Sequence, residues 1–358
     1  MKRTIKLESA YDFLGSILTE PVIFRSFELV PSGEKLTWDL VNRLHEIRAE
    51  VPFLYIDDLD RNPEPKMFST YTLNELYSKV RALMSYYSYD TLEDVAVVTE
   101  IIESTIVGLK NAVNFDLDEY LLKINDIYSH TLNTTVIAIL LAIKSGQFTN
   151  WIIQQLAIGS LLHDIGYIKL LEDCGVKAIS ELTHEQKILH PVVGYEMVLP
   201  DSYVSDMAKK IILMHHFWNH PEKSFDTEKG YYLSYPFEYN SKKIPVWSKS
   251  LSVSIVHVAS DFEHFINDMS PNRITKKEAI DRILASREIV YGDAALLLAN
   301  YISPYSIGDT VRLTNGKQGK VTSMTPLASR PIVTVNNRQI DLAKNKGVSI
   351  SEVVVSNG

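Results

Sequence analysis

The sequence predicts a mainly α-helical protein in which a central helical bundle lies between two small strand-containing modules. Three observations predict this arrangement. Apolar residues recur at helical spacing through the middle of the chain, short apolar runs alternate with turn signals before it, and two-residue alternation follows it. The expected domains are a small α+β module at 1–65, an all-helical domain at 66–302 and a small β module at 303–358.

The N-terminal module is expected to combine strands with one helix. The segment PVIFRSFELVPSGEKLTWDLVNRLHEI predicts a strand, a turn at Pro-Ser-Gly and then a helix capped by Thr37. A second strand is expected at FLYIDDLD, and RNPEPK has the composition of a linker.

The central segment carries helix signals and no convincing strand alternation. Capping boxes are expected at THEQ (183–186) and TKKE (275–278), each before a helical run. Gly146 and Gly166 stand where helices are expected to end. We therefore expect the core of this domain to be entirely helical.

The C-terminal module is expected to be built from hairpins. DTVRLTNGKQGKVTSM has two alternating runs around Asn315-Gly316, which is a strong hairpin signal. PIVTVNNRQIDL repeats the pattern around Asn336-Asn337.

Composition limits the function classes. The formal net charge of −8 argues against broad attraction to nucleic-acid polymers or to anionic membranes. The single cysteine, Cys174, excludes a disulfide framework and a multi-thiolate zinc site, and it fits a reducing compartment. No apolar run approaches the roughly 20 residues of a bilayer span, and the first residues do not read as a secretory signal. We therefore expect a cytoplasmic protein.

Histidines and acidic residues gather in the helical segment, at the ends or in the middle of apolar runs. They are Asp126 and His130, His163 and Asp164, His190 on an expected helix over 185–197, His215 and His216, and His257 with Asp261 and His264. A single histidine of this kind is more often a core residue than a ligand, and His257 is either a buried helix residue or a group that orients Asp261. Burying so many titratable groups is costly unless they are paired or bound to metal. Mixed histidine and aspartate ligands suit iron, manganese or zinc.

The order of these residues resembles a known family. His130, then His163-Asp164, then Asp261 is similar to the H…HD…D signature of the HD metal-dependent phosphohydrolases. The additional His190 and His215-His216 resemble the HD-GYP subfamily of cyclic di-GMP phosphodiesterases. The segments HDIGYIKL, LTHEQKILHPVVGYEM, MHHFW, KKIPVWSKSLSVSIVHVASDF and NYISPYSIGDTVRLTNGKQGKV follow the family's order, so the resemblance covers roughly Asp126 to Val335.

The resemblance implies an HD-type helical domain with two divalent ions, iron or manganese, that share Asp164. The ligand sets it implies are His130, His163 and Asp261 for one ion, and His190, His215 and His216 for the other. Asp126 takes the place of a carboxylate that holds a third ion in some members. The implied reaction of this bacterial signalling family is hydrolysis of cyclic di-GMP to linear pGpG, GMP or both. A hydroxide that bridges the metals attacks phosphorus, with Asp164 and His163 at the catalytic centre.

The sequence departs from the family around the substrate. Tyr167 replaces the lysine of the usual HD-x-x-K, and no compact GYP follows the double histidine. Arg273 is the remaining candidate phosphate contact, and Trp218 is a candidate for stacking on a guanine base. Three outcomes stay open: an active cyclic di-GMP phosphodiesterase, a nucleotide sensor or interaction scaffold without turnover, or a hydrolase of a different phosphoester. The expected small-molecule partner is a cyclic dinucleotide, and a homodimer or a signalling-protein partner is left open.

Overall fold

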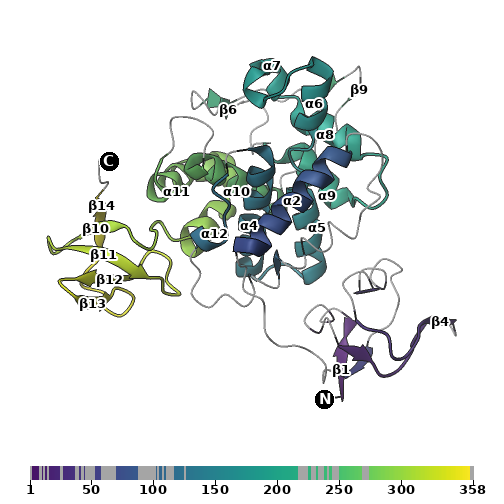
Figure 1. Ribbon diagram of the computed structural model, residues 1–358, viewed down its shortest axis with the longest axis horizontal. Helices are drawn as coiled ribbons and strands as arrows, with labels where there is room; N and C mark the ends of the chain where they lie inside the picture. Colours follow the sequence, from purple (N-terminus) through teal and green to yellow (C-terminus); the bar gives the residue numbers. More distant parts are fainter. Residues whose placement is uncertain are drawn as a thin grey trace.

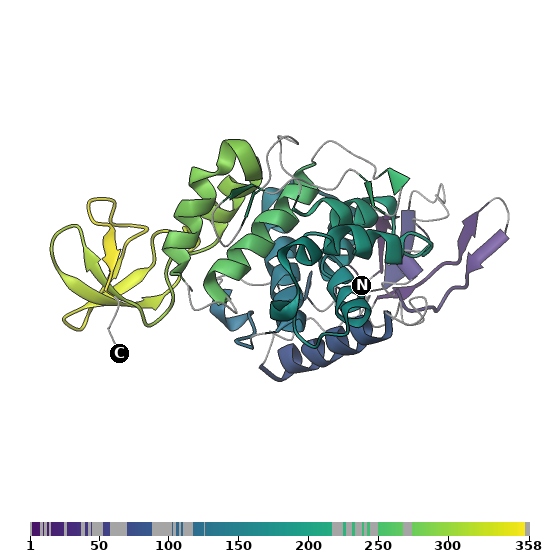
Figure 2. The same ribbon diagram turned by 90° about the horizontal axis from the view of Figure 1, so that it is seen from above.

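The computed structural model describes parts of residues 2–57, residues 70–87, 117–124, 126–216, 250–267 and 274–354, and short pieces at 102–109 and 225–243. The described part is mainly helical and has strands at both ends, as the sequence predicts. The helical bundle lies between the two strand-containing ends of the molecule (Figures 1 and 2). The domain boundaries drawn from the sequence stay predictions.

The N-terminal strands form two small sheets. β5 (Phe53–Asp57) is the middle strand of a sheet with β1 (Lys2–Lys6) and β2 (Ile17–Leu18), all antiparallel. β5 confirms the strand expected at FLYIDDLD. The single strand expected in PVIFRSFELV is instead a hairpin of β3 (Val22–Phe24) and β4 (Phe27–Val30), and Thr37 lies outside the described residues.

The helical bundle is organised around α4 (Ile127–Ser145). This helix contacts α2 (Thr70–Tyr87), α5 (Asn150–Leu161), α10 (Leu251–Asn267) and α12 (Asp293–Tyr301). Among the described residues, α4 alone is long and apolar enough to cross a membrane, but 83% of its apolar window is buried inside the molecule. Its apolar surface on all sides is therefore explained by the helices packed around it.

Shorter helices surround this centre. They are α6 (Gly166–Cys174), α7 (His184–Lys187), α8 (His190–Val198), α9 (Asp206–Met214) and α11 (Lys276–Ala285), with the short helices η2 (Leu117–Glu119), η3 (Ile179–Glu181) and the π-helical η4 (Arg287–Tyr291). Both predicted capping boxes are present, at Thr183 and Thr275, and Gly146 ends α4 in a left-handed conformation.

Three expectations for this region are wrong. The helix expected over 185–197 is divided into α7 and α8, because a new helix begins at His190 with Pro191 in its first turn. Gly166 begins α6 instead of ending a helix. Four two-residue strands, β6 (Phe225–Asp226), β7 (Tyr231–Tyr232), β8 (Glu238–Tyr239) and β9 (Lys242–Lys243), pair as two hairpins, so the region is not entirely helical.

The C-terminal module is a five-stranded antiparallel sheet in the order β13-β12-β11-β10-β14. Its strands are β10 (Thr310–Leu313), β11 (Gln318–Ser323), β12 (Ile332–Val335), β13 (Arg338–Asp341) and β14 (Ile350–Val353). Both predicted hairpins are confirmed. Asn336 and Asn337 have φ of 48° and 61°, the left-handed pair that a tight hairpin turn requires. The module has a hydrophobic core of its own, which includes Val311, Val321 and Val333.

The contact between α6 and α8 depends on a glycine. A Cβ atom added at Gly166 would lie 2.0 Å from the carbonyl oxygen of His190 and 2.6 Å from the amide nitrogen of Gly194. The backbones of the two helices therefore touch at this point. Because Gly166 follows Asp164 by two residues, this contact brings the start of α8 to the His163-Asp164 turn.

We expect Gly166→Ala to destabilise the protein by at least roughly 1–3 kcal/mol, because two rigid backbones must separate to admit a methyl group. The midpoint of thermal unfolding measures this. Gly347→Ala is the control, since the nearest atom to an added Cβ there is 3.7 Å away. An unchanged midpoint for Gly166→Ala would contradict the close packing of α6 on α8.

Candidate metal centre

Most of the histidines and aspartates singled out from the sequence meet inside the bundle. His163 and Asp164 lie in the turn between α5 and α6, His190 begins α8, and His215 and His216 follow α9 directly. His130 lies one turn into α4. All but His216, which is half-buried, are buried. Three of the four chain positions, all except His130, therefore lie in turns or at helix ends. The side chains meet at one point without the burial of long polar helix faces.

Three of the imidazole rings are oriented by their own backbone. Each Nδ1 lies within hydrogen-bonding distance of the carbonyl oxygen three residues earlier: His163 with Ser160 (2.7 Å), His190 with Lys187 (2.6 Å) and His215 with Ile212 (2.8 Å). A carbonyl only accepts, so Nδ1 must donate in each case. In the neutral ring, Nε2 then carries a lone pair and is available as a metal ligand.

The Nε2 atoms of these three rings and of His130 face one another in two pairs. His163 Nε2 is 3.3 Å from His130 Nε2, and His190 Nε2 is 3.1 Å from His215 Nε2. In the neutral His190 and His215 rings both Nε2 atoms carry lone pairs, which repel each other at this distance, and a shared cation removes the repulsion. The facing nitrogens therefore fit a bound metal ion at each pair.

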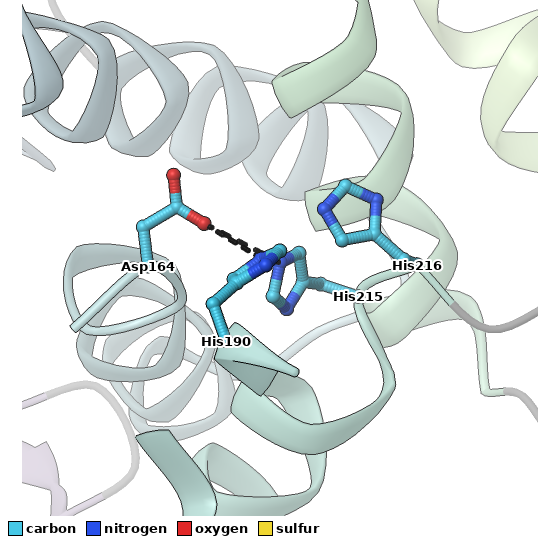
Figure 3. A group of neighbouring side chains, drawn as sticks. All are labelled: Asp164, His190, His215 and His216. Carbon is cyan, nitrogen blue, oxygen red and sulfur yellow. Dashed lines mark hydrogen bonds and ion pairs between the residues drawn. The ribbon is translucent and has the colours of Figure 1, made fainter. Parts of the chain in front are cut away.

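Asp164 lies between the two pairs. Its Oδ2 is 3.4 Å from His163 Nε2 and 3.5 Å from His130 Nε2. Its Oδ1 is 3.1 Å from His190 Nε2 and 3.5 Å from His215 Nε2, and it is buried without the geometry of a hydrogen bond. Figure 3 shows the carboxylate turned toward His190 and His215, with His216 beside them. One carboxylate oxygen thus faces each histidine pair, as a bridging ligand requires.

Two groups of possible ligands result, and they share Asp164. Asp164, His190, His215 and His216 have ligand atoms that all lie within 4.8 Å of one another, and so do His130, His163 and Asp164. Nitrogen and carboxylate donors of this kind suit divalent iron, manganese or zinc.

The electrostatics favour the metal-binding state of Asp164 and of three of the imidazoles. Burial lowers the pKa of His163 to about 3, and burial also lowers the pKa of His215 and His216, so these rings are neutral at pH 7. Burial alone would raise the pKa of the Asp164 carboxyl, but the surrounding imidazoles hold it well below its usual range. Asp164 is therefore an anion beside the neutral rings of His163 and His215. At His130 burial alone would lower the pKa, but the Glu263, Asp164 and Asp261 carboxylates raise it.

Asp261 makes contacts of its own beside the cluster, and its expected ligand role stays a prediction. Its Oδ2 accepts a hydrogen bond from Tyr291 (2.7 Å) and lies 3.2 Å from His257 Nε2. Among the described residues it groups with His216 and His257 instead of with His130 and His163. The contact from His257 favours the interpretation that this histidine orients Asp261.

Asp126 takes part in two structural hydrogen bonds, and its third-metal role stays a prediction. Its side chain caps α4 by accepting from the Ser129 amide (2.8 Å), and its other oxygen accepts from the Tyr77 hydroxyl (2.5 Å). The hydrogen bond to Asp126 raises the pKa of Tyr77 to about 12. No group of possible metal ligands among the described residues includes Asp126. The Asp-x-x-Ser capping box accounts for the contact between this carboxylate and the start of α4.

Of the three expected substrate contacts, only Tyr167 belongs to the described residues. Its ring stacks on His190 with centroids 4.1 Å apart and an angle of 13°. Burial raises the pKa of Tyr167 well above its usual range, so the hydroxyl is neutral. Lys169 pairs with Asp173 at the surface (2.7 Å) and does not replace the missing lysine. Arg273 and Trp218 lie outside the described residues.

Sequence reasoning missed two buried residues of the site. Tyr291 comes from the π-helical η4, a feature that often marks functional sites but has no sequence signal here. Glu263 lies 2.5 Å from His130 Nδ1. It follows Asp261 by two residues, a spacing that places the two side chains about 200° apart around an ideal helix. Only the packing of α10 on α4 shows that Glu263 is also buried.

Comparison with known proteins identifies the central region. Residues 127–259 match the family model of the HD domain. The central helical region is an HD domain. A comparison with curated proteins gives no match. Among solved structures, Bd1817, a HDG"Y"P protein from Bdellovibrio bacteriovorus, is similar with a TM-score of 0.43 and 14% identity, over 83% of this chain and 98% of that chain. The HD domain and the clustered donors support a metal-dependent phosphohydrolase.

Because Asp164 is shared, its loss should affect both ion positions. We expect Asp164→Ala to lose both ions after reconstitution with Mn²⁺ and gel filtration, whereas His215→Ala should lose one. Metal analysis per chain by mass spectrometry measures the difference. Asp173→Ala, an exposed carboxylate of the adjacent helix, is the control. Equal metal content in Asp164→Ala and the unsubstituted protein would contradict the bridging role.

Proposed function

We propose that the protein is a metal-dependent phosphodiesterase that hydrolyses cyclic di-GMP to linear pGpG, GMP or both. The observation that carries the proposal is the buried Asp164 carboxylate between two pairs of facing imidazole nitrogens. The order of the histidines and aspartates, which resembles that of HD-GYP phosphodiesterases, supports the choice of substrate. Iron or manganese fits the mixed histidine and carboxylate donors.

Two adjacent divalent ions supply the chemistry that phosphodiester hydrolysis requires. When bound, such ions lower the pKa of water and neutralise the developing negative charge at phosphorus. They also provide the local positive charge that an acidic protein needs in order to bind an anionic nucleotide.

The chain's own residues have defined tasks in this proposal. The backbone carbonyls behind His163, His190 and His215 fix the ring orientation, so the Nε2 atoms point inward before any ion arrives. Tyr291 and His257 fix Asp261. Such prior orientation limits the reorganisation that catalysis requires.

Tyr167 favours a second candidate function. The family places a lysine at this position to contact the scissile phosphate, and here a neutral ring stacks on His190 instead. This substitution fits either of two alternatives: a sensor or scaffold that binds the nucleotide without turnover, or a hydrolase of a different phosphoester. Arg273 and Trp218 stay predicted contacts for phosphate and base.

The test is product formation by the purified full chain. The protein is loaded with Fe²⁺ under anaerobic conditions or with Mn²⁺, incubated with cyclic di-GMP, and the products are separated by chromatography. We expect linear pGpG or GMP, and we expect neither from Asp164→Ala. Asp173→Ala should behave like the unsubstituted protein.

Other outcomes decide between the alternatives. Two bound ions without product, but with saturable binding of cyclic di-GMP, would indicate a sensor. Two bound ions with neither product nor binding would direct the search to other phosphoesters, beginning with another cyclic dinucleotide. A protein that retains no ion would contradict the enzyme proposal.

A further inference from the structure

His130 is oriented in a different way from the other three rings of the facing pairs. The Nδ1 atoms of His163, His190 and His215 each meet a backbone carbonyl of their own segment. His130 Nδ1 instead meets the carboxylate of Glu263, 2.5 Å away and 133 residues later in the chain. One ring of the four therefore depends on a charged side chain from another helix.

The position of His130 explains the difference. The other three rings lie at helix ends or in turns, where backbone carbonyls are free to accept a side-chain hydrogen bond. His130 lies inside α4, where carbonyls accept from amides four residues later. The ring must therefore find its acceptor on a neighbouring helix, and α10 packs against α4 along this face.

Glu263 is itself held in place from two helices. Its Oε1 accepts from Asn133 Nδ2 (2.9 Å) on α4 and from Asn267 Nδ2 (3.0 Å) on α10. Asn133 is fixed in turn by the backbone of Leu122. Its Oδ1 accepts a hydrogen bond from the Leu122 amide (2.8 Å), and its Nδ2 donates one to the Leu122 carbonyl (3.0 Å). Both oxygens of this buried carboxylate thus have defined donors.

The hydrogen-bond partners of Glu263 fit an acceptor role. The amide nitrogens of Asn133 and Asn267, which meet Oε1, can only donate. The other oxygen, Oε2, meets His130 Nδ1. A carboxylate that accepts at both oxygens requires this Nδ1 to donate, which leaves Nε2 to face His163.

We propose that Glu263 is a positioning residue that holds His130 in the tautomer and orientation required to bind metal on the His130–His163 side of Asp164. The proposal rests on the metal centre of the proposed function and not on the identity of the substrate. A carboxylate that accepts from a ligating imidazole also makes the ring a stronger electron donor, and loss of such a partner typically costs 10- to 100-fold in metal affinity.

A direct ligand role for Glu263 is the competing interpretation. His130, Glu263 and His264 have possible ligand atoms within 4.8 Å of one another. The contacts favour positioning, because the oxygens of Glu263 already accept from three side-chain donors. His264 stacks its ring face on His130, with centroids 4.2 Å apart and an angle of 22°.

The test compares Mn²⁺ binding to the unsubstituted protein and to the Glu263→Ala and Glu263→Gln variants, by calorimetry and by metal analysis. We expect Glu263→Ala to lower the affinity for one of the two Mn²⁺ ions by about 10- to 100-fold and to leave the affinity for the other unchanged. Glu263→Gln keeps an acceptor oxygen without the charge and should show a smaller loss. Asn267→Ala is the matched control, because it removes one donor to Glu263 and leaves the contact with His130 in place.

A second readout separates positioning from a general loss of structure. Nitrogen NMR of the metal-free protein reports which imidazole nitrogen carries the proton. We expect a protonated Nδ1 at His130 in the unsubstituted protein and in Glu263→Gln, and a tautomer mixture at His130 alone in Glu263→Ala. If Glu263→Ala does not fold, the Glu263→Gln pair of measurements decides.

Three results would overturn the proposal: unchanged affinities for both ions with an unchanged His130 tautomer in both variants, three ions that fall to two in Glu263→Ala, or an unsubstituted protein that binds no ion. The second of these results would make Glu263 a ligand. Two ions with the expected loss in Glu263→Ala, but no hydrolysis of cyclic di-GMP, would overturn the proposed substrate and leave this inference standing.

Discussion

The structure depends on one constraint, the burial of the Asp164 carboxylate among imidazole rings whose lone pairs face one another. A buried anion and several buried rings are costly unless their polar atoms are satisfied. The backbone satisfies one nitrogen of three rings and Glu263 satisfies one nitrogen of the fourth. The inward nitrogens face one another and the Asp164 carboxylate, an arrangement that divalent ions would satisfy together.

The arrangement of helices follows from this constraint. His163, His190 and His215 lie at interruptions of the helical chain, where a ring can bond a free carbonyl and still point inward. Close packing brings these interruptions together. Gly166 lets α6 touch the backbone of α8 at His190, and Gly159 lets α5 approach α9 beside Ile211. The central α4 carries His130 and supplies the apolar surface against which the other helices pack.

Local signals in the sequence predicted much of the fold. The capping boxes at Thr183 and Thr275 and the turn at Asn336-Asn337 are determined by neighbouring residues, and all three are present. The division of the predicted helix over 185–197 had a local signal in Pro191 that the apolar periodicity concealed. The hairpins between 225 and 243 have short strands, too short for a reliable alternation pattern.

The site was predictable where function requires a recognisable residue type, and less so where contacts depend on packing. The histidines and Asp164 could be named because imidazole and carboxylate groups stand out in apolar runs. Asp126 also stood out, and its contacts with the Tyr77 hydroxyl and the start of α4 add a structural role that its residue type alone did not indicate. Glu263 gave no such signal, because its burial depends on how α10 packs against α4.

The most direct measurement is a crystal structure of the protein grown with Mn²⁺, with anomalous diffraction data to locate the ions. We predict two anomalous peaks, one on each side of Asp164, within bonding distance of the facing Nε2 atoms. The account would be contradicted if no anomalous peak lay beside Asp164 and the facing Nε2 atoms were turned apart or joined by N–H···N hydrogen bonds.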